Sequence, residues 1–228
     1  MLEAFVVRRA FMREENKEYN KLFVEIIGAL RGLKPESVLA GLRQKLLSGG
    51  GSTRRWPSDA DLIEHAIGKP VFDLQRTSVL RLVLERLELA QRGKKTEGHD
   101  IPPGLQIEHV LPQSWAANWP LRGMVIPAGV ASLPYLAKDE LKELVEPIRQ
   151  RNSQLQTLGN RTLLNKYLNP AVSNGSFDSK RAEYRHSVLR LNRYFDGLDG
   201  WDEAAIAGRG RKLAEMMCEV WPRPKQPV

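Results

Sequence analysis

The residues whose types and spacing could perform chemistry lie in two short segments near the middle of the chain. In 107–113, Glu108 and His109 stand side by side at the end of an apolar run, and in 158–164, Asn160 immediately precedes a second apolar run. A histidine can take a proton from water near neutrality, because its unperturbed pKa is about 6.5. Carboxylate and amide oxygens are hard ligands that suit Mg²⁺. These residue types together suit metal-assisted hydrolysis of a phosphodiester.

A third polar residue, Asn169, follows on a segment that is typical of a short helix ended by a proline. In a strand–strand–helix unit, the end of the first strand faces the first turn of the helix. We therefore predict that His109 is the general base, with Asn160 holding the loop that bears it. Glu108 and Asn169 are the predicted metal ligands. Asn174 is a rival to Asn169 for the metal position.

Basic residues are concentrated around the same segments. The whole chain has a formal charge of +8 and a pI near 9.7. Between residues 149 and 193, nine arginines and lysines face two acids, a local net charge of +7. Charge of this kind supplies the sequence-independent part of DNA affinity. The expected DNA-binding residues are Arg161, Lys166, Lys180, Arg181 and Arg185.

The elements that must position these residues are mostly helices. Leu105 and Ile107 alternate with polar residues, which predicts a strand ending at His109, and 161–164 is typical of a second strand. Apolar residues at helical spacing predict helices at about 2–12, 20–30, 35–46, 59–67, 77–93, 138–145, 148–156, 177–195 and 202–219. We expect an α+β protein that is predominantly α-helical, with a helical domain and linker in 1–103 and the catalytic unit with C-terminal helices in 104–228. Because the first helical pattern has no cap before it, we also expect that a further domain precedes it.

The remaining residues that could do chemistry have ordinary structural explanations. Cys218 is the single cysteine, which excludes an internal disulfide and a multi-cysteine zinc site. His65 and His186 are expected to be packing or surface residues, and a metal role for His99 has little support. The tryptophans at 115 and 119 could stack on bases, but we expect them to wedge their loop onto the core.

Composition limits the class of protein further. Hydrophobic residues make up 42% of the chain, enough to build a core. No apolar run approaches the roughly 20 residues that cross a bilayer. We expect a soluble cytoplasmic protein without a membrane partner.

These motifs together resemble the His-Me finger (HNH) nuclease superfamily, and within it the C-terminal nuclease domain of GmrSD-type, modification-dependent restriction endonucleases. The residues that carry the resemblance are 107–113, 158–165, 168–169, Asn174, Phe177, Lys180 and Tyr184. The start of the chain, 2–9, also looks like the helical segment that precedes that domain. The resemblance implies a ββα-metal core embedded in helices, with His109 as general base, Asn160 as orienting residue and Asn169 as the helix position.

The resemblance also implies an activity. The implied activity is a Mg²⁺- or Mn²⁺-dependent DNA endonuclease, which nicks one strand or cuts both. It would act in a bacterial anti-phage system directed at modified or foreign DNA. An N-terminal nucleotide-hydrolysing or sensing domain of the same polypeptide would control it.

The chain departs from the family pattern at several places. The acid is Glu108 rather than aspartate, and the connection from His109 to Asn160 is much longer than in minimal HNH units. Asn165 and Leu168 stand where simpler HNH proteins have a cysteine pair, so no structural zinc is expected. Two alternatives stay open, a catalytically inactive DNA-binding module and an RNase on the same scaffold.

Overall fold

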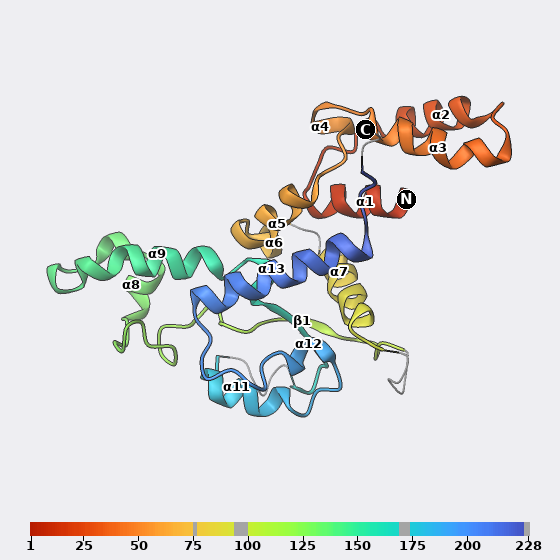
Figure 1. The fold of residues 1–228 in the computed structure, drawn as a ribbon. Coiled ribbons are helices and arrows are strands. Elements are labelled where there is room, and N and C mark those ends of the chain that lie inside the picture. Colours follow the sequence, from red (N-terminus) through yellow and green to blue (C-terminus); the bar gives the residue numbers. More distant parts are fainter. Residues whose placement is uncertain (75–76, 94–99, 169–173, 226–228) are drawn as a thin grey trace.

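The fold is predominantly helical around one small antiparallel sheet, in agreement with the expected α+β class. In a computed structural model of the chain, the residues described are 1–74, 77–93, 100–168 and 174–225 (Figure 1). The helices before the sheet are α1 (Leu2–Phe11), α2 (Tyr19–Leu30), α3 (Pro35–Leu47), α4 (Gly51–Arg54), α5 (Asp59–Gly68), α6 (Val71–Leu74) and α7 (Thr77–Ala90). Between the strands lie α8 (Ala128–Ser132), η1 (Pro134–Leu136), η2 (Asp139–Leu144), α9 (Val145–Gln154) and η3 (Leu158–Asn160). The chain closes with α11 (Phe177–Tyr184), α12 (Arg190–Arg193) and α13 (Glu203–Val220).

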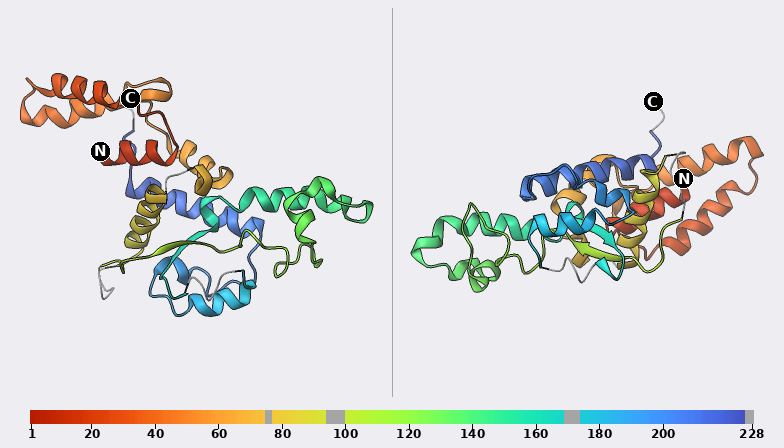
Figure 2. Two further views of the ribbon diagram at one scale, coloured as in Figure 1. Left: turned by 180° about the vertical axis from the view of Figure 1, so that it is seen from behind. Right: turned by 90° about the horizontal axis from the view of Figure 1, so that it is seen from below.

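The sheet consists of β1 (Gln106–His109) and β2 (Arg161–Leu164), which confirms both expected strands. They pair antiparallel, with Glu108 opposite Thr162 and His109 opposite Arg161. The register therefore brings the end of β1 beside the start of β2, where the candidate residues of the two sequence segments meet. The sheet lies between α13 on one side and the α11–α12 region on the other (Figures 1 and 2).

The hydrophobic core crosses the boundary expected at residue 103. One buried cluster combines side chains of α1, α5 and α7 with Leu105, Leu163 and the α13 residues Leu213 and Met217. A second cluster is built from residues between Val110 and Ile206. Helix α13 packs against α5, α7 and η3, so it connects the N-terminal helices to the sheet. In contrast, the α2–α3 hairpin projects away from this body (Figure 1).

The single helix expected over 177–195 is wrong, because the chain turns after Tyr184 and resumes as α12 at Arg190. Ser187 lies in this turn, where its hydroxyl accepts hydrogen bonds from the backbone of Leu189 at 3.2 Å and from Asn192 Nδ2 at 2.7 Å. Such local side-chain bonds compete with the helical backbone pattern. The expected helix over 138–145 forms instead as the 3₁₀ turn η2, which leads into α9. Among the described residues, no helix is both long and apolar enough to cross a bilayer.

The start of β2 is fixed by a close approach between η3 and α13. A methyl group added at Gly159 would lie 1.9 Å from the Ile206 carbonyl oxygen and 2.8 Å from the Gly210 nitrogen. Both neighbours are backbone atoms, which cannot move without shifting the helix. Glycine is therefore required at this position to let α13 contact the turn before Asn160.

We predict that Gly159→Ala lowers the free energy of unfolding by about 2 kcal/mol or more, because overpacking against backbone forces main-chain shifts. Gly208→Ala, at an exposed position of α13 with nothing within 4 Å of the added methyl, is the control. It should be neutral or slightly stabilising, since alanine favours helix. Equal urea stability of the two variants would contradict the proposed crossing of η3 and α13.

Candidate functional site

His109 ends β1 and is held on two sides. Its Nε2 atom lies 2.9 Å from Oε1 of Gln156, which follows α9. The ring of Phe72, from α6, meets the imidazole edge-on, with centroids 4.9 Å apart and planes at 67°. The imidazole is therefore fixed in direction by one hydrogen bond and one aromatic contact.

The surroundings of His109 keep its ring neutral. Burial lowers its pKa to about 3, and the positive charges of Arg161 and Lys180 act in the same direction, whereas the hydrogen bond to Gln156 Oε1 raises the pKa. A neutral imidazole has one nitrogen with a free electron pair. His109 is thus in the protonation state that a general base needs before reaction.

Asn160 is fully buried and bonds the loop that follows His109. Its Oδ1 accepts from the Leu111 backbone nitrogen at 2.7 Å, and its Nδ2 donates to the carbonyl oxygens of Leu111 at 2.8 Å and Leu155 at 2.9 Å. The Asn160 carbonyl accepts from Val110 N at 3.1 Å. The amide therefore joins the end of α9, the start of β2 and the loop after β1.

Glu108 points toward α11, where it meets a buried lysine. Lys180 Nζ lies 2.7 Å from Glu108 Oε1 and donates to the His109 carbonyl oxygen at 2.6 Å. The Lys180 side chain is 0% exposed, and burial lowers its pKa, with the charge of Glu108 opposing that effect. A buried ammonium is tolerated only when it is paired and hydrogen-bonded. This ion pair ties α11 to the end of β1.

The five residues expected to bind DNA divide into buried and accessible ones. Lys180 and Arg161 are buried at 0% exposure, so their positions do not suit direct contact with a phosphate. Burial follows from their partners, since Arg161 donates to the Leu155 carbonyl at 2.6 Å and lies over Phe72. Lys166 and Arg185 are exposed, while Arg181 is half-buried and paired with Asp178 at 2.8 Å.

One small pocket of about 170 Å³ gathers the candidate chemistry. Its lining is Glu108, His109, Pro112, Gln113, Ser114 and Asn174. Asn174 is anchored through its backbone carbonyl oxygen, which accepts a hydrogen bond from Asn118 Nδ2 at 2.8 Å. The structure thus brings Glu108, His109 and Asn174 together, whereas Asn169 lies outside the described residues.

The donor set of this pocket fits a hard divalent cation. Mg²⁺ takes one or two carboxylates and keeps several waters, and Glu108 and Asn174, which carry a carboxylate and an amide, both line the pocket. Within the described part of the chain, no group of three or more His, Cys, Asp or Glu side chains could hold a metal by itself. A cation here would therefore be bound by few protein ligands, with water or substrate supplying the rest.

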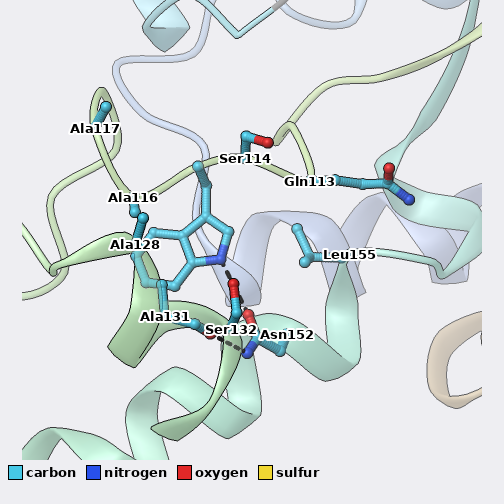
Figure 3. A pocket seen from close by; sticks show the side chains of 10 residues that line it. Gln113, Ser114, Ala116, Ala117, Ala128, Ala131, Ser132, Asn152 and Leu155 are labelled. Carbon is cyan, nitrogen blue, oxygen red and sulfur yellow. Dashed lines mark hydrogen bonds between the residues drawn. The ribbon is translucent and has the colours of Figure 1, made fainter. Parts of the chain in front are cut away.

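A second pocket, of about 360 Å³, adjoins the first through the shared residues Gln113 and Ser114. Asn152 lies at its base and bonds Trp115 Nε1 at 3.0 Å and the Ala131 carbonyl at 2.8 Å (Figure 3). Trp115 is 1% exposed and Trp119 is 6% exposed, so both tryptophans fix their loop to the core, as expected. Their burial leaves the indole faces unsuited to stacking on bases.

Sequence reasoning missed Gln156 and Phe72. Neither residue belongs to an apolar period or a charged cluster, and both reach His109 only because α6, α9 and the sheet converge. Gln156 stands four residues before Asn160, but spacing alone gives a glutamine no role.

The other histidines are away from this pocket or not described. His65 is buried against Phe11, His186 is exposed, and His99 lies outside the described residues.

Comparison with known proteins matches a family model to most of the chain. The model, described as GmrSD restriction endonucleases, C-terminal domain, matches residues 56–216. This range includes the helices from α5 to α7, both strands, α11 and most of α13. No curated protein and no solved structure matches the chain.

Two histidines, the buried His65 and the half-buried His109, should make the fold sensitive to acid. Burial lowers the pKa of His109 to about 3 and that of His65 to about 4, whereas both titrate near ~6.5 when unfolded. Below that pH the unfolded chain binds protons that the folded chain does not. We predict that the free energy of unfolding falls from about pH 6.5 downward, by at most about 1.4 kcal/mol per pH unit for each histidine.

Urea unfolding of the wild type and of His109→Gln, measured at several pH values from about 7 to about 5, checks this prediction. The variant should show the shallower dependence, because one of the two histidines is gone. Parallel curves for the two proteins would contradict a depressed pKa at His109.

Proposed function

The chain belongs to the family of GmrSD restriction endonuclease C-terminal domains, and from this membership we propose a metal-dependent DNA endonuclease with His109 as general base. The family supports a restriction endonuclease-type nuclease, for which DNA is the implied substrate. The observation that carries the finer proposal is the meeting of His109, Glu108 and Asn174 at one pocket, from segments far apart in the sequence.

His109 acts on the attacking water. Its neutral imidazole accepts the proton as the water oxygen attacks phosphorus. The P–O bond to the leaving nucleotide oxygen breaks, and that oxygen takes a proton from solvent. Without substrate, burial and then the charges of Arg161 and Lys180 lower the pKa of His109, and a phosphodiester in the pocket would supply the opposite charge. Substrate binding would therefore raise the pKa of His109 and so its basicity toward the attacking water.

Two residues, Asn160 and Lys180, hold this arrangement. Asn160 fixes the loop after His109 through both ends of its amide, and Lys180 fixes the Glu108 carboxylate at the edge of the pocket. Glu108 and Asn174 would hold a divalent cation, Mg²⁺ or Mn²⁺, with Asn169 as the alternative amide. Such a cation neutralises charge that develops on the phosphate.

The DNA backbone would lie along the accessible basic residues. Lys166 and Arg185 are exposed, and Lys166 lies 5.0 Å from the ring of the exposed Tyr167. Arg181 is within reach of solvent but already has Asp178 as partner. Lys166 and Arg185 are thus the better candidates for phosphate contacts.

We further propose that the chain is the cutting part of a bacterial restriction system directed at modified or foreign DNA. The family description supports the restriction role. A nucleotide-hydrolysing or sensing domain of the same polypeptide would then choose the target.

A second candidate is a DNA-binding module without catalysis. The ion pair of Glu108 with Lys180 favours it, because a carboxylate neutralised by a buried ammonium is a weaker metal ligand. Binding without cleavage under any divalent cation would select this candidate, and cleavage of RNA alone would select an RNase.

We predict that the chain nicks or linearises supercoiled plasmid with Mg²⁺ or Mn²⁺ and that a chelator abolishes the reaction. His109→Ala should lose at least about 10²-fold in rate, the usual contribution of a general base. His186→Ala, which removes an exposed histidine, is the matched control and should cleave like the wild type. Parallel digests of DNA and RNA identify the substrate. Undiminished cleavage by His109→Ala would rule out His109 as the base.

We also predict that Lys166→Ala combined with Arg185→Ala weakens DNA binding equally for all sequences. For each phosphate that the variant no longer neutralises, the slope of log K against log salt concentration should become shallower by about 0.9. Fluorescence anisotropy on a labelled duplex at several salt concentrations measures both quantities. Lys34→Ala, at the start of α3 on the projecting hairpin, is the control, and an equal effect there would contradict the assigned surface.

A further inference from the structure

The side chain of Gln156 lies between the His109 imidazole and the Arg161 guanidinium, on the two strands of the sheet. Its Oε1 atom is 2.9 Å from His109 Nε2, and the same Oε1 accepts a hydrogen bond from Arg161 Nη2. His109 and Arg161 are directly opposite each other in the sheet register. The three side chains therefore form one connected set at the start of β2.

The chemistry of arginine determines which end of the Gln156 amide faces this set. A guanidinium has donors and no acceptor. The atom of Gln156 bonded to Arg161 must then be its carbonyl oxygen, and the usual uncertainty between amide oxygen and nitrogen does not arise. The same oxygen faces His109 Nε2 and can only accept.

An acceptor at Nε2 decides the tautomer of a neutral imidazole. Nε2 must carry the proton, so that the free electron pair is on Nδ1. We propose that Gln156, held by Arg161, is a positioning residue that sets this tautomer and makes Nδ1 of His109 the proton-accepting atom. The catalytic meaning of Nδ1 rests on the proposed function, whereas the tautomer itself does not.

The packing around Arg161 supports this assignment. Its guanidinium is held by the Leu155 carbonyl at 2.6 Å and lies 4.5 Å from the centre of the Phe72 ring. Phe72 also contacts the His109 ring edge-on, which closes a ring of four side chains. A fully buried arginine is costly. Because Arg161 is too buried to contact a phosphate directly, we assign it the role of orienting Gln156.

The tautomer can be observed directly by ¹⁵N NMR of the histidine rings in the full chain, with the His109 signals assigned from their loss in His109→Gln. We expect wild-type His109 with the proton on Nε2. Gln156→Met, which removes the acceptor at similar length, should shift the population toward the Nδ1-protonated form. Gln156→Glu keeps an acceptor between the two partners and should restore the Nε2 proton. Gln150→Met, at an exposed position of α9, is the control and should change nothing.

Cleavage kinetics provide the second measurement. With Gln156→Met, kcat should fall by about 10- to 100-fold, the usual effect of losing a residue that orients a functional histidine, with KM little changed. Gln156→Glu should recover most of the activity. Near-UV circular dichroism establishes that each variant is folded.

The outcomes separate this inference from the proposed function. An Nδ1-protonated ring in the wild type, or an unchanged Nε2-protonated ring in folded Gln156→Met, overturns the role of Gln156. If Gln156→Met shifts the tautomer but no nucleic acid is cut by any protein, the positioning of His109 stands and the nuclease assignment fails.

Discussion

The buried amide of Asn160 is the constraint on which the rest of the site depends. It donates and accepts at Leu111, donates to Leu155 and accepts from Trp201 Nε1 at 3.2 Å. Each buried bond contributes about 1 kcal/mol, but leaving such a group unpaired costs about 1–3 kcal/mol. The loop after His109 therefore cannot leave the start of β2 without exposing several unpaired groups at once. Gly159 next to it allows α13 to seal this junction from solvent.

The site combines neutral and charged groups by burying both. His109 is neutral because the ring is desolvated beside two cations, and Lys180 keeps its place through Glu108 and the His109 carbonyl. Interactions between charges are stronger in such an interior than in water. In the function proposed here, an incoming phosphodiester would meet preorganised positive charge beside His109.

The N-terminal helices have a direct part in the site. Phe72 of α6 contacts both His109 and Arg161, and α7 packs on β2. The family match, which starts at residue 56, includes these helices. The sequence pattern suggested a helical domain and a linker before residue 103. The core shared by α1, α5, α7 and α13 explains why the helices before that position and the sheet after it pack as one body.

The sequence by itself determined the two strands, most of the helices and the polar residues at the strand ends. Period-two alternation before His109 and the apolar run after Asn160 are local signals, and local signals are what a sequence displays. Only the tertiary structure decided which basic residues are buried. Arg161 and Lys180 look like Lys166 in sequence, yet Arg161 lies under Phe72 of α6 and Lys180 is paired with Glu108 of β1. The turn that ends α11 at Tyr184 also escaped, because the apolar spacing continues through the turn while Ser187 accepts a hydrogen bond from Asn192. The orientation of His109 was likewise decided by the tertiary structure, because it depends on the contact of its ring with Gln156.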